Sequence, residues 1–117
     1  MIGPMGNVQV WLVCGVSDMR RGIDSLAAQV QLKLEANPYG GHMFVFRGRR
    51  GDRVKILWYD GNSEGMCLFL KRLERGQFFW PQAADGAVHL TQGQLSMLLE
   101  GINWLQPAKL WRPRRAA

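Results

Sequence analysis

The sequence has little of the side-chain chemistry on which enzymes and metal proteins depend. It contains two histidines and two cysteines among 117 residues, namely His42, His89, Cys14 and Cys67. No CxxC or HxxxH spacing occurs, and neither histidine stands in a nucleophile motif. Two cysteines are also too few for a disulfide framework and fit a reducing compartment. We therefore predict that the chain is not an enzyme and has no catalytic site, no cofactor and no metal ion.

Long apolar runs are also missing. The longest, Val10 to Cys14, suits one buried strand and falls far short of the roughly 18 residues that a membrane helix needs. The segment Met1–Asn7 lacks the basic and apolar regions of a secretory signal. These observations predict a cytoplasmic protein with no membrane partner.

Positive charge is plentiful and unevenly placed. The formal net charge is +6, and eight of the fifteen lysines and arginines fall between Arg47 and Arg75. The last segment, Gly101–Ala117, carries four basic residues and no acidic one. A basic balance of this kind favours polyanionic partners and says nothing about the fold.

The first half of the chain predicts a strand followed by a helix. Val8–Val13 is rich in β-branched and aromatic residues, as strands are. From Asp18 to Glu35 apolar residues recur every three or four positions, which predicts an amphipathic helix capped by Ser17 or Asp18. Its apolar stripe should pack on the sheet and consists of Met19, Ile23, Leu26, Val30 and Leu34.

The second half has the pattern of short strands joined by glycine-rich turns, which favours an antiparallel meander. The expected strands are residues 42–46, 54–59 and 66–70, with further short strands at 78–80 and 88–90. Thr91 should cap a second helix that Gly101 ends. We predict a single α+β domain over residues 1–104, with a mainly antiparallel sheet of four to five strands and two helices. Residues 105–117 should form a basic, extended tail.

The basic residues are the candidate nucleic-acid contacts. Arginine offers a planar donor fork that matches phosphate oxygens, and the neighbouring glycines let a backbone approach a polyanion closely. Three alternatives to nucleic-acid contact stay open for these residues. They are a solvated turn, a surface ion pair with Glu74 and a tail that only increases solubility. The candidates are Arg47, Arg49, Arg50, Arg53, Lys55, Lys71, Arg72, Arg75, Arg112, Arg114 and Arg115.

Trp104 and Trp111 lie outside the expected elements, so they are the candidate anchors for a protein partner, with local packing as the alternative. The acidic residues could in principle hold magnesium, as in nucleases. Most of these aspartates, however, adjoin expected turns and helix starts, where aspartate is common in any case.

Several long motifs carry a family resemblance. They are Asp18–Gly22 with Leu26, His42–Asp52, Lys55–Trp58, Cys67–Gly76 and Leu98–Trp104. Together they resemble the TnpB-type accessory protein, the second open reading frame product, of insertion sequence family sixty-six. The resemblance covers roughly Val10 to Arg112. It does not extend to the RNA-guided nucleases that share the TnpB label.

The resemblance implies a non-enzymatic helper of DNA transposition, encoded beside a separate transposase. Its expected partners are DNA, that transposase and a further accessory protein. Two roles stay open: DNA contact through arginine-rich loops, and an adaptor that binds the transposase without touching DNA. The loop Asp60–Gly65 is about two residues longer than the usual Asp-Gly-x-Gly link of the family, which puts a role for this loop in doubt.

Overall fold

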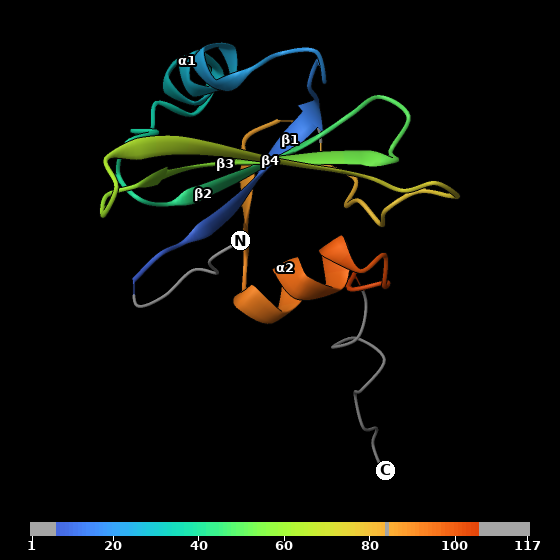
Figure 1. The fold of residues 1–117 in the computed structure, drawn as a ribbon. Helices are drawn as coiled ribbons and strands as arrows, with labels where there is room; N and C mark the ends of the chain where they lie inside the picture. The colour runs from blue at the N-terminus through green and yellow to red at the C-terminus, as the bar shows by residue number, and fades with distance from the viewer. Residues whose placement is uncertain (1–6, 84, 106–117) are drawn as a thin grey trace.

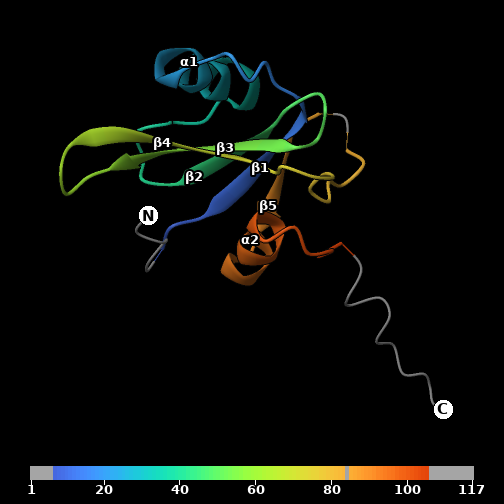
Figure 2. The same cartoon turned by 45° about the vertical axis from the view of Figure 1, so that its right-hand side comes forward.

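The computed structural model describes residues 7–83 and 85–105, which form a sheet with one helix on each face (Figures 1 and 2). This architecture confirms the predicted α+β class. In chain order the elements are β1 (Val10–Val16), α1 (Ile23–Leu34), β2 (Met43–Arg47), β3 (Arg53–Asp60), β4 (Gly65–Arg72), β5 (Ala87–Leu90) and α2 (Gln92–Leu99).

The sheet has the strand order β4-β3-β2-β1-β5. β2, β3 and β4 form the expected antiparallel meander, and β5 runs antiparallel to β1. β1 and β2 are parallel, because the chain returns through α1 before it enters β2. One parallel pair therefore lies inside a sheet that is otherwise antiparallel.

Two apolar clusters fill the two faces of the sheet. On one face Leu26 and Val30 of α1 pack with Phe44, Phe46 and Leu57. On the other face the buried residues include Leu95 and Leu98 of α2, together with Val45, Ile56 and Trp104. Because both faces are covered, β2 is apolar at consecutive positions and does not alternate with polar residues.

α1 begins later than predicted. Its N-cap is Gly22, and Ser17 and Asp18 have other roles. The buried Ser17 hydroxyl accepts a hydrogen bond from Nε2 of Gln29 at 3.0 Å, and Asp18 closes a turn with Arg20. The predicted apolar stripe is right at Leu26 and Val30. Ile23, the first helical residue, is 36% exposed and does not belong to the core.

The structure confirms the strand predicted at residues 88–90, which is β5, and the second predicted helix, which is α2. It does not contain the strand predicted at residues 78–80. Thr91 and Gln94 form a reciprocal capping box at the start of α2. Gly101 adopts φ +76 and ends the helix, with the Ile102 N–H bonded to the Met97 carbonyl. Residues 78–80 form no strand, because their polar groups bond to the turn between β2 and β3.

None of the helices that the described residues form has the length and apolar character required to cross a membrane.

Candidate nucleic-acid interface

The arginine-rich stretch predicted as a hairpin turn connects β2 to β3. The Gly51 N–H donates to the Gly48 carbonyl at 3.1 Å, which places Arg49 and Arg50 at the two central positions of a tight turn. Both arginines are exposed. Gly51 has φ +79, a left-handed conformation that glycine adopts without strain. The turn geometry therefore directs two adjacent guanidinium groups into solvent.

Residues 77–80, which follow β4, hold this turn in place through hydrogen bonds. The carbonyl of Gly51 accepts hydrogen bonds from the Phe78 N–H at 2.9 Å and from Nε1 of Trp80 at 3.0 Å. Nε2 of Gln77 donates to the Arg50 carbonyl at 2.7 Å. These contacts were missed by sequence reasoning, because each joins groups more than twenty residues apart in the sequence, and two of them start from side chains. They hold the arginine turn in one shape.

The connection between β1 and α1 lies beside this turn, at the same end of the sheet (Figures 1 and 2). The Asp18 carboxylate accepts bonds from the Arg20 backbone N–H at 2.9 Å and from its Nε and Nη2 atoms at 3.0 and 2.9 Å. The hydrogen bonds from the Arg20 side chain, and then that from its backbone N–H, lower the pKa of Asp18 to about 2. Asp18 therefore keeps its charge, and so keeps its hold on Arg20, at any physiological pH.

The two connections enclose a cleft of about 590 Å³, hereafter the arginine cleft. Its walls touch at Gly48, where a Cβ atom would lie 2.6 Å from Cγ of Met19. The cleft is lined by Val16, Ser17, Asp18, Met19, Arg20 and Arg21 on one side and by Gly48, Arg49, Arg50, Asp52 and Arg53 on the other. Five arginines thus face one hollow that contains two aspartates.

Most of this positive charge is uncompensated. Among the described residues, ion pairs form between Arg20 and Asp18 and between Arg72 and Glu74, and none involves Arg21, Arg49, Arg50 or Arg53. Arg53 is also paired directly across the sheet with Arg72, and like charges in that position repel. Guanidinium groups that have no acidic partner are available to bind phosphate or carboxylate oxygens, often bidentately.

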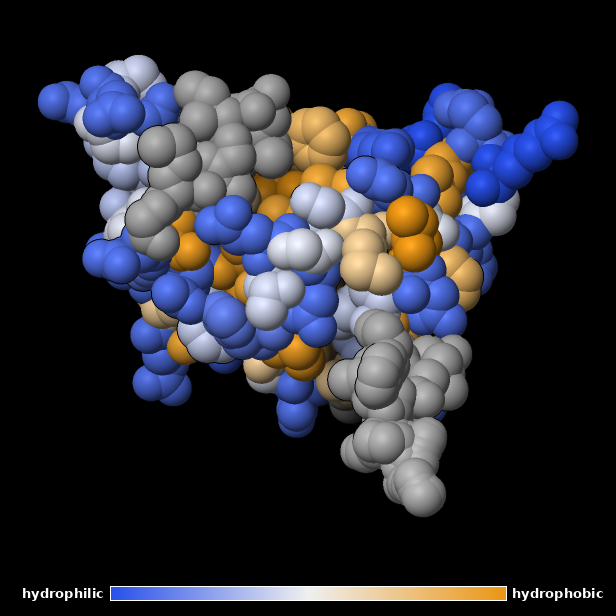
Figure 3. All heavy atoms as spheres, turned by 90° about the horizontal axis from the view of Figure 1, so that it is seen from below, coloured by the Kyte–Doolittle hydropathy of each residue, from blue (hydrophilic) through white to orange (hydrophobic). Residues whose placement is uncertain are grey.

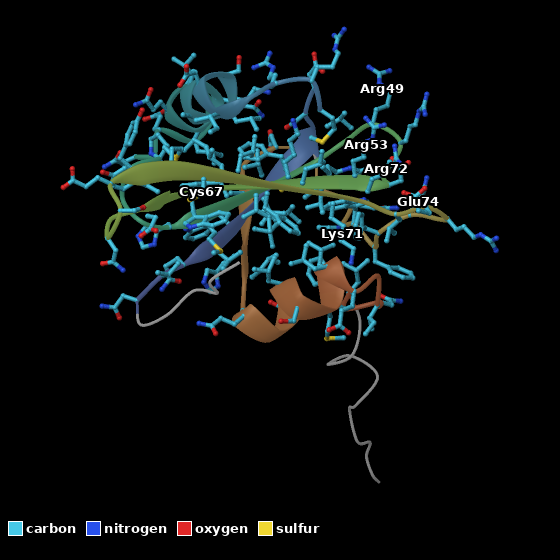
Figure 4. The ribbon with its side chains drawn as sticks, in the orientation of Figure 1. Arg49, Arg53, Cys67, Lys71, Arg72 and Glu74 are labelled. Carbon is cyan, nitrogen blue, oxygen red and sulfur yellow. The ribbon has the colours of Figure 1, made fainter. Side chains whose placement is uncertain are left out.

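The structure brings together four of the predicted basic residues. Arg49, Arg50 and Arg53 line the cleft, and Arg72 stands beside Arg53 on the face that carries α1 (Figure 4). Arg20 and Arg21 complete the site and were missed as site residues. The signal was present, since both lie in the Asp18–Gly22 motif that contributed to the resemblance.

The two predicted lysines do not line the cleft. Lys55 is 8% exposed, and its Nζ donates to the Arg21 carbonyl at 2.8 Å. Lys71 points to the opposite face (Figure 4), where its Nζ donates to the Leu99 carbonyl at the end of α2, at 2.6 Å. Lys55 thus positions a cleft wall, and Lys71 stabilises a helix C-terminus.

Arg47 and Arg75 also lie outside the cleft. The Arg47 guanidinium sits over the Trp80 ring, 5.3 Å from its centroid, and lines a second hollow with Phe79 and Leu105. Arg75 is exposed in the segment after β4. Arg47 and the arginines of the turn therefore line two separate hollows.

Trp104 packs locally, which is the alternative to its role as an anchor for a protein partner. Its side chain is 5% exposed, and its Nε1 donates to the Phe79 carbonyl at 2.9 Å, so it belongs to the core on the α2 face. The other predicted contacts near the C-terminus, Trp111, Arg112, Arg114 and Arg115, lie outside the described residues.

Within residues 7–83 and 85–105, no three histidine, cysteine, aspartate or glutamate side chains converge as metal ligands would. The loop Asp60–Gly65 joins β3 to β4 at the end of β3 opposite to the arginine turn. It is closed by Asp60, which accepts hydrogen bonds from Asn62 and Ser63, both at 3.0 Å. This loop therefore takes no part in the cleft.

Comparisons with known proteins agree with the resemblance seen in the motifs. No solved structure matches the chain. A protein of Sinorhizobium fredii, the uncharacterized protein y4hO, is 51% identical over 93% of each chain. A second from the same organism, the uncharacterized protein y4jC, is 39% identical over the whole of both chains. The family model for the IS66 Orf2-like protein matches residues 8–109. The chain belongs to this family and is an accessory protein associated with the transposition of an insertion sequence.

Proposed function

We propose that this accessory protein contacts DNA through the arginine cleft and performs no catalysis itself. The observation that supports this proposal best is the cleft itself, where five arginines from two separate connections and the first position of β3 line one hollow. Four of them have no acidic partner among the described residues.

The physical basis is the phosphate backbone. Guanidinium groups bind phosphate oxygens bidentately, and each neutralised phosphate releases condensed counterions. The turn that carries Arg49 and Arg50 is held by three hydrogen bonds from Gln77, Phe78 and Trp80. A solvated turn needs no such bracing, whereas a binding surface loses less conformational entropy when it is rigid beforehand.

The proposal is tested by measuring the affinity for duplex DNA as a function of salt. Four or five phosphate contacts predict a slope of log affinity against log salt of about −4. Changing Arg49 and Arg50 to alanine should flatten the slope by up to about two units and should weaken binding to all sequences alike. Fluorescence anisotropy with the element's terminal repeats and with random duplex measures both quantities.

Two matched variants control this experiment. Lys33→Ala removes one charge from an exposed position in the last turn of α1, and it should leave the slope closer to wild type than Arg49→Ala does. Changing Arg49 and Arg50 to lysine keeps the charge, so the slope should persist even if affinity falls. Wild-type affinity in the double alanine variant would overturn the proposal.

A second candidate role is an adaptor for the transposase. It is favoured by three exposed apolar side chains on the α2 side, Phe79, Ile102 and Leu105, two of which line the hollow beside Arg47. The described part of this face is otherwise a mosaic of small apolar patches divided by polar residues (Figure 3). Binding to the transposase that persists at high salt and is lost in Phe79→Ala would support the adaptor role.

A further inference from the structure

The hollow beside Arg47, hereafter the Arg47 hollow, lies on the face of the sheet opposite to the arginine cleft and measures about 530 Å³. Phe44 and Phe46 of β2 pack under α1, so strand alternation turns the next residue, Arg47, to the α2 face. The turn between β2 and β3 separates the two hollows, since Gln77 and Trp80 bond to this turn and also line the second hollow. The lining of the Arg47 hollow consists of Arg47, residues 77–83 and Leu105.

This hollow combines a guanidinium group with aromatic rings, and none of the described residues that line it is acidic. The Arg47 guanidinium sits over the Trp80 ring, which in turn meets Phe78 edge-on with ring centroids 5.8 Å apart. Phe79, which also lines the hollow, is 39% exposed. Nε of Arg47 is buried and has no hydrogen-bond acceptor among the described residues, where Arg47 also forms no ion pair. Its guanidinium therefore favours a ligand that brings acceptor atoms.

An unpaired nucleobase has the chemistry that this lining recognises. Unpaired bases stack on aromatic rings and on guanidinium planes, and their exposed edges carry both donors and acceptors. The side-chain amides of Gln77 and Gln82, in the same lining, can bond to both kinds of group. A duplex keeps its bases stacked inside, where such a hollow cannot reach them. A purely apolar ligand would leave the Arg47 guanidinium without an acceptor.

We propose that the Arg47 hollow binds an unpaired base of single-stranded DNA whose phosphates lie along the turn between β2 and β3. The proposal rests on the proposed DNA contact and names the form of DNA that is preferred, a duplex that continues into a single strand. Arg47 directly precedes the turn, so a strand that leaves the arginine cleft passes Arg49 and Arg50 before its bases reach Phe79. A single strand can bend around the end of the sheet, whereas duplex DNA is stiff over about 150 base pairs.

Matched DNA probes separate the contribution of the base from that of the phosphates. Fluorescence anisotropy compares a blunt duplex, the same duplex with a single-stranded thymine tail, and the same duplex with an abasic tail of equal length, each tail in both polarities. Wild type should bind a thymine-tailed duplex at least about fivefold more tightly than the abasic-tailed one, because a base gains this much from stacking on an aromatic side chain. The two tails carry the same phosphate charge. Equal affinities for them in both polarities would overturn the proposal.

Phe79→Ala tests where the base binds. The change removes an exposed ring from the hollow and keeps the Phe79 carbonyl that accepts the hydrogen bond from Trp104. The variant should lose the preference for the thymine tail and keep the wild-type affinity for the blunt duplex, which also shows that it is folded. Tyr39→Ala is the matched control, since Tyr39 is 52% exposed and lines neither hollow. It should keep the preference. A Phe79→Ala protein with an undiminished preference would overturn the proposal.

The same probes distinguish this proposal from the proposed function on which it rests. Changing Arg49 and Arg50 to alanine should weaken binding to all three probes alike, so the ratio between the thymine and abasic tails should persist. Wild-type protein that binds the blunt duplex but does not distinguish the tails would contradict only the base contact. Binding to the thymine tail without any binding to the blunt duplex would support the base contact and contradict the phosphate contact at the arginine cleft. Loss of transposase binding in Phe79→Ala, with the tail preference intact, would assign the hollow to a protein partner and overturn the proposal.

Discussion

The Asp18 carboxylate shows how one residue can shape a basic site without binding anything itself. It accepts three hydrogen bonds from Arg20 and lies at the lip of the arginine cleft. Such an exposed pair contributes little to global stability. Its effect is local: it closes the turn that precedes α1 and fixes the direction of one of the five cleft arginines.

We expect the titration of Asp18 to report this arrangement. Its folded pKa is about 2, below the ordinary 3.8, so the interaction is fully present above the ordinary value and is lost as the pH falls through about 2. Carboxyl chemical shifts measured by NMR against pH should give this midpoint. Arg20→Ala should raise it toward 3.8, whereas Arg75→Ala should leave it unchanged. A wild-type midpoint near 3.8 would mean that Arg20 does not hold the carboxylate.

At the scale of elements, the cleft depends on how closely two connections approach. Gly48 is buried, and the space where its Cβ would lie is occupied by the Met19 side chain. The Lys55 amine also ties the carbonyl of Arg21 to the sheet. The separation of the two cleft walls is therefore fixed by one missing side chain and one hydrogen bond.

Gly48→Ala should weaken DNA binding without changing any charge. The new methyl group would lie 2.6 Å from Cγ of Met19, so one wall has to move. Overpacking of this kind costs about 1–3 kcal/mol. Denaturant unfolding should show this loss, and anisotropy should show reduced affinity.

Gly61→Ala is the matched control for this prediction, since a Cβ at Gly61 meets nothing within 4 Å. It should leave stability and binding near wild type. Adding Met19→Ala to the Gly48 variant should recover part of the loss, because it empties the contested space. A Gly48→Ala protein with wild-type stability and affinity would show that the walls are not in contact in solution.

Helices and strands were predicted correctly where turn residues, capping residues or hydrophobic periodicity alone determine their bounds. The three strands between residues 42 and 70, the Thr91 cap and the Gly101 stop were all predicted from turn chemistry and periodicity. The pairing of β1 with β2 was not, because strand orientation follows from the crossover through α1. Residues 78–80 have the composition of a strand, but the Phe78 N–H and Nε1 of Trp80 donate hydrogen bonds to the Gly51 carbonyl instead of to a neighbouring strand.

The candidate site was only half predicted, for a similar reason. The hairpin arginines are contiguous in the sequence, so their clustering is visible there. Arg20 and Arg21 reach the same cleft through the parallel pairing of β1 and β2. Lys55 and Lys71 look like surface charges in the sequence, yet each amine bonds to a carbonyl on another element. Charge counting cannot distinguish a lysine that faces solvent from one that completes a helix end.

For the whole molecule, the sheet is the layer that both cores share. Leu26 belongs to the cluster under α1, and Leu98 belongs to the cluster over α2. Consecutive residues of β2 alternate between these clusters, with Phe44 and Phe46 in one and Met43 and Val45 in the other. Loosening one face therefore exposes the backbone that supports the other face. The two clusters should unfold together.

Leu26→Ala and Leu98→Ala should each lower the free energy of unfolding by about 2–5 kcal/mol, because each side chain is fully buried and its removal leaves a cavity. Urea unfolding followed by tryptophan fluorescence and by far-ultraviolet circular dichroism should give coincident single transitions for both variants. Leu32→Ala is the control: Leu32 is 81% exposed, so its loss should change stability by less than about 0.5 kcal/mol. Two separate transitions in either core variant would show that the faces of the sheet unfold independently. In that case the hydrogen bonds from residues 77–80 would not hold the arginine turn once the α2 face had unfolded, because these residues pack on the α2 face and bond to the turn between β2 and β3.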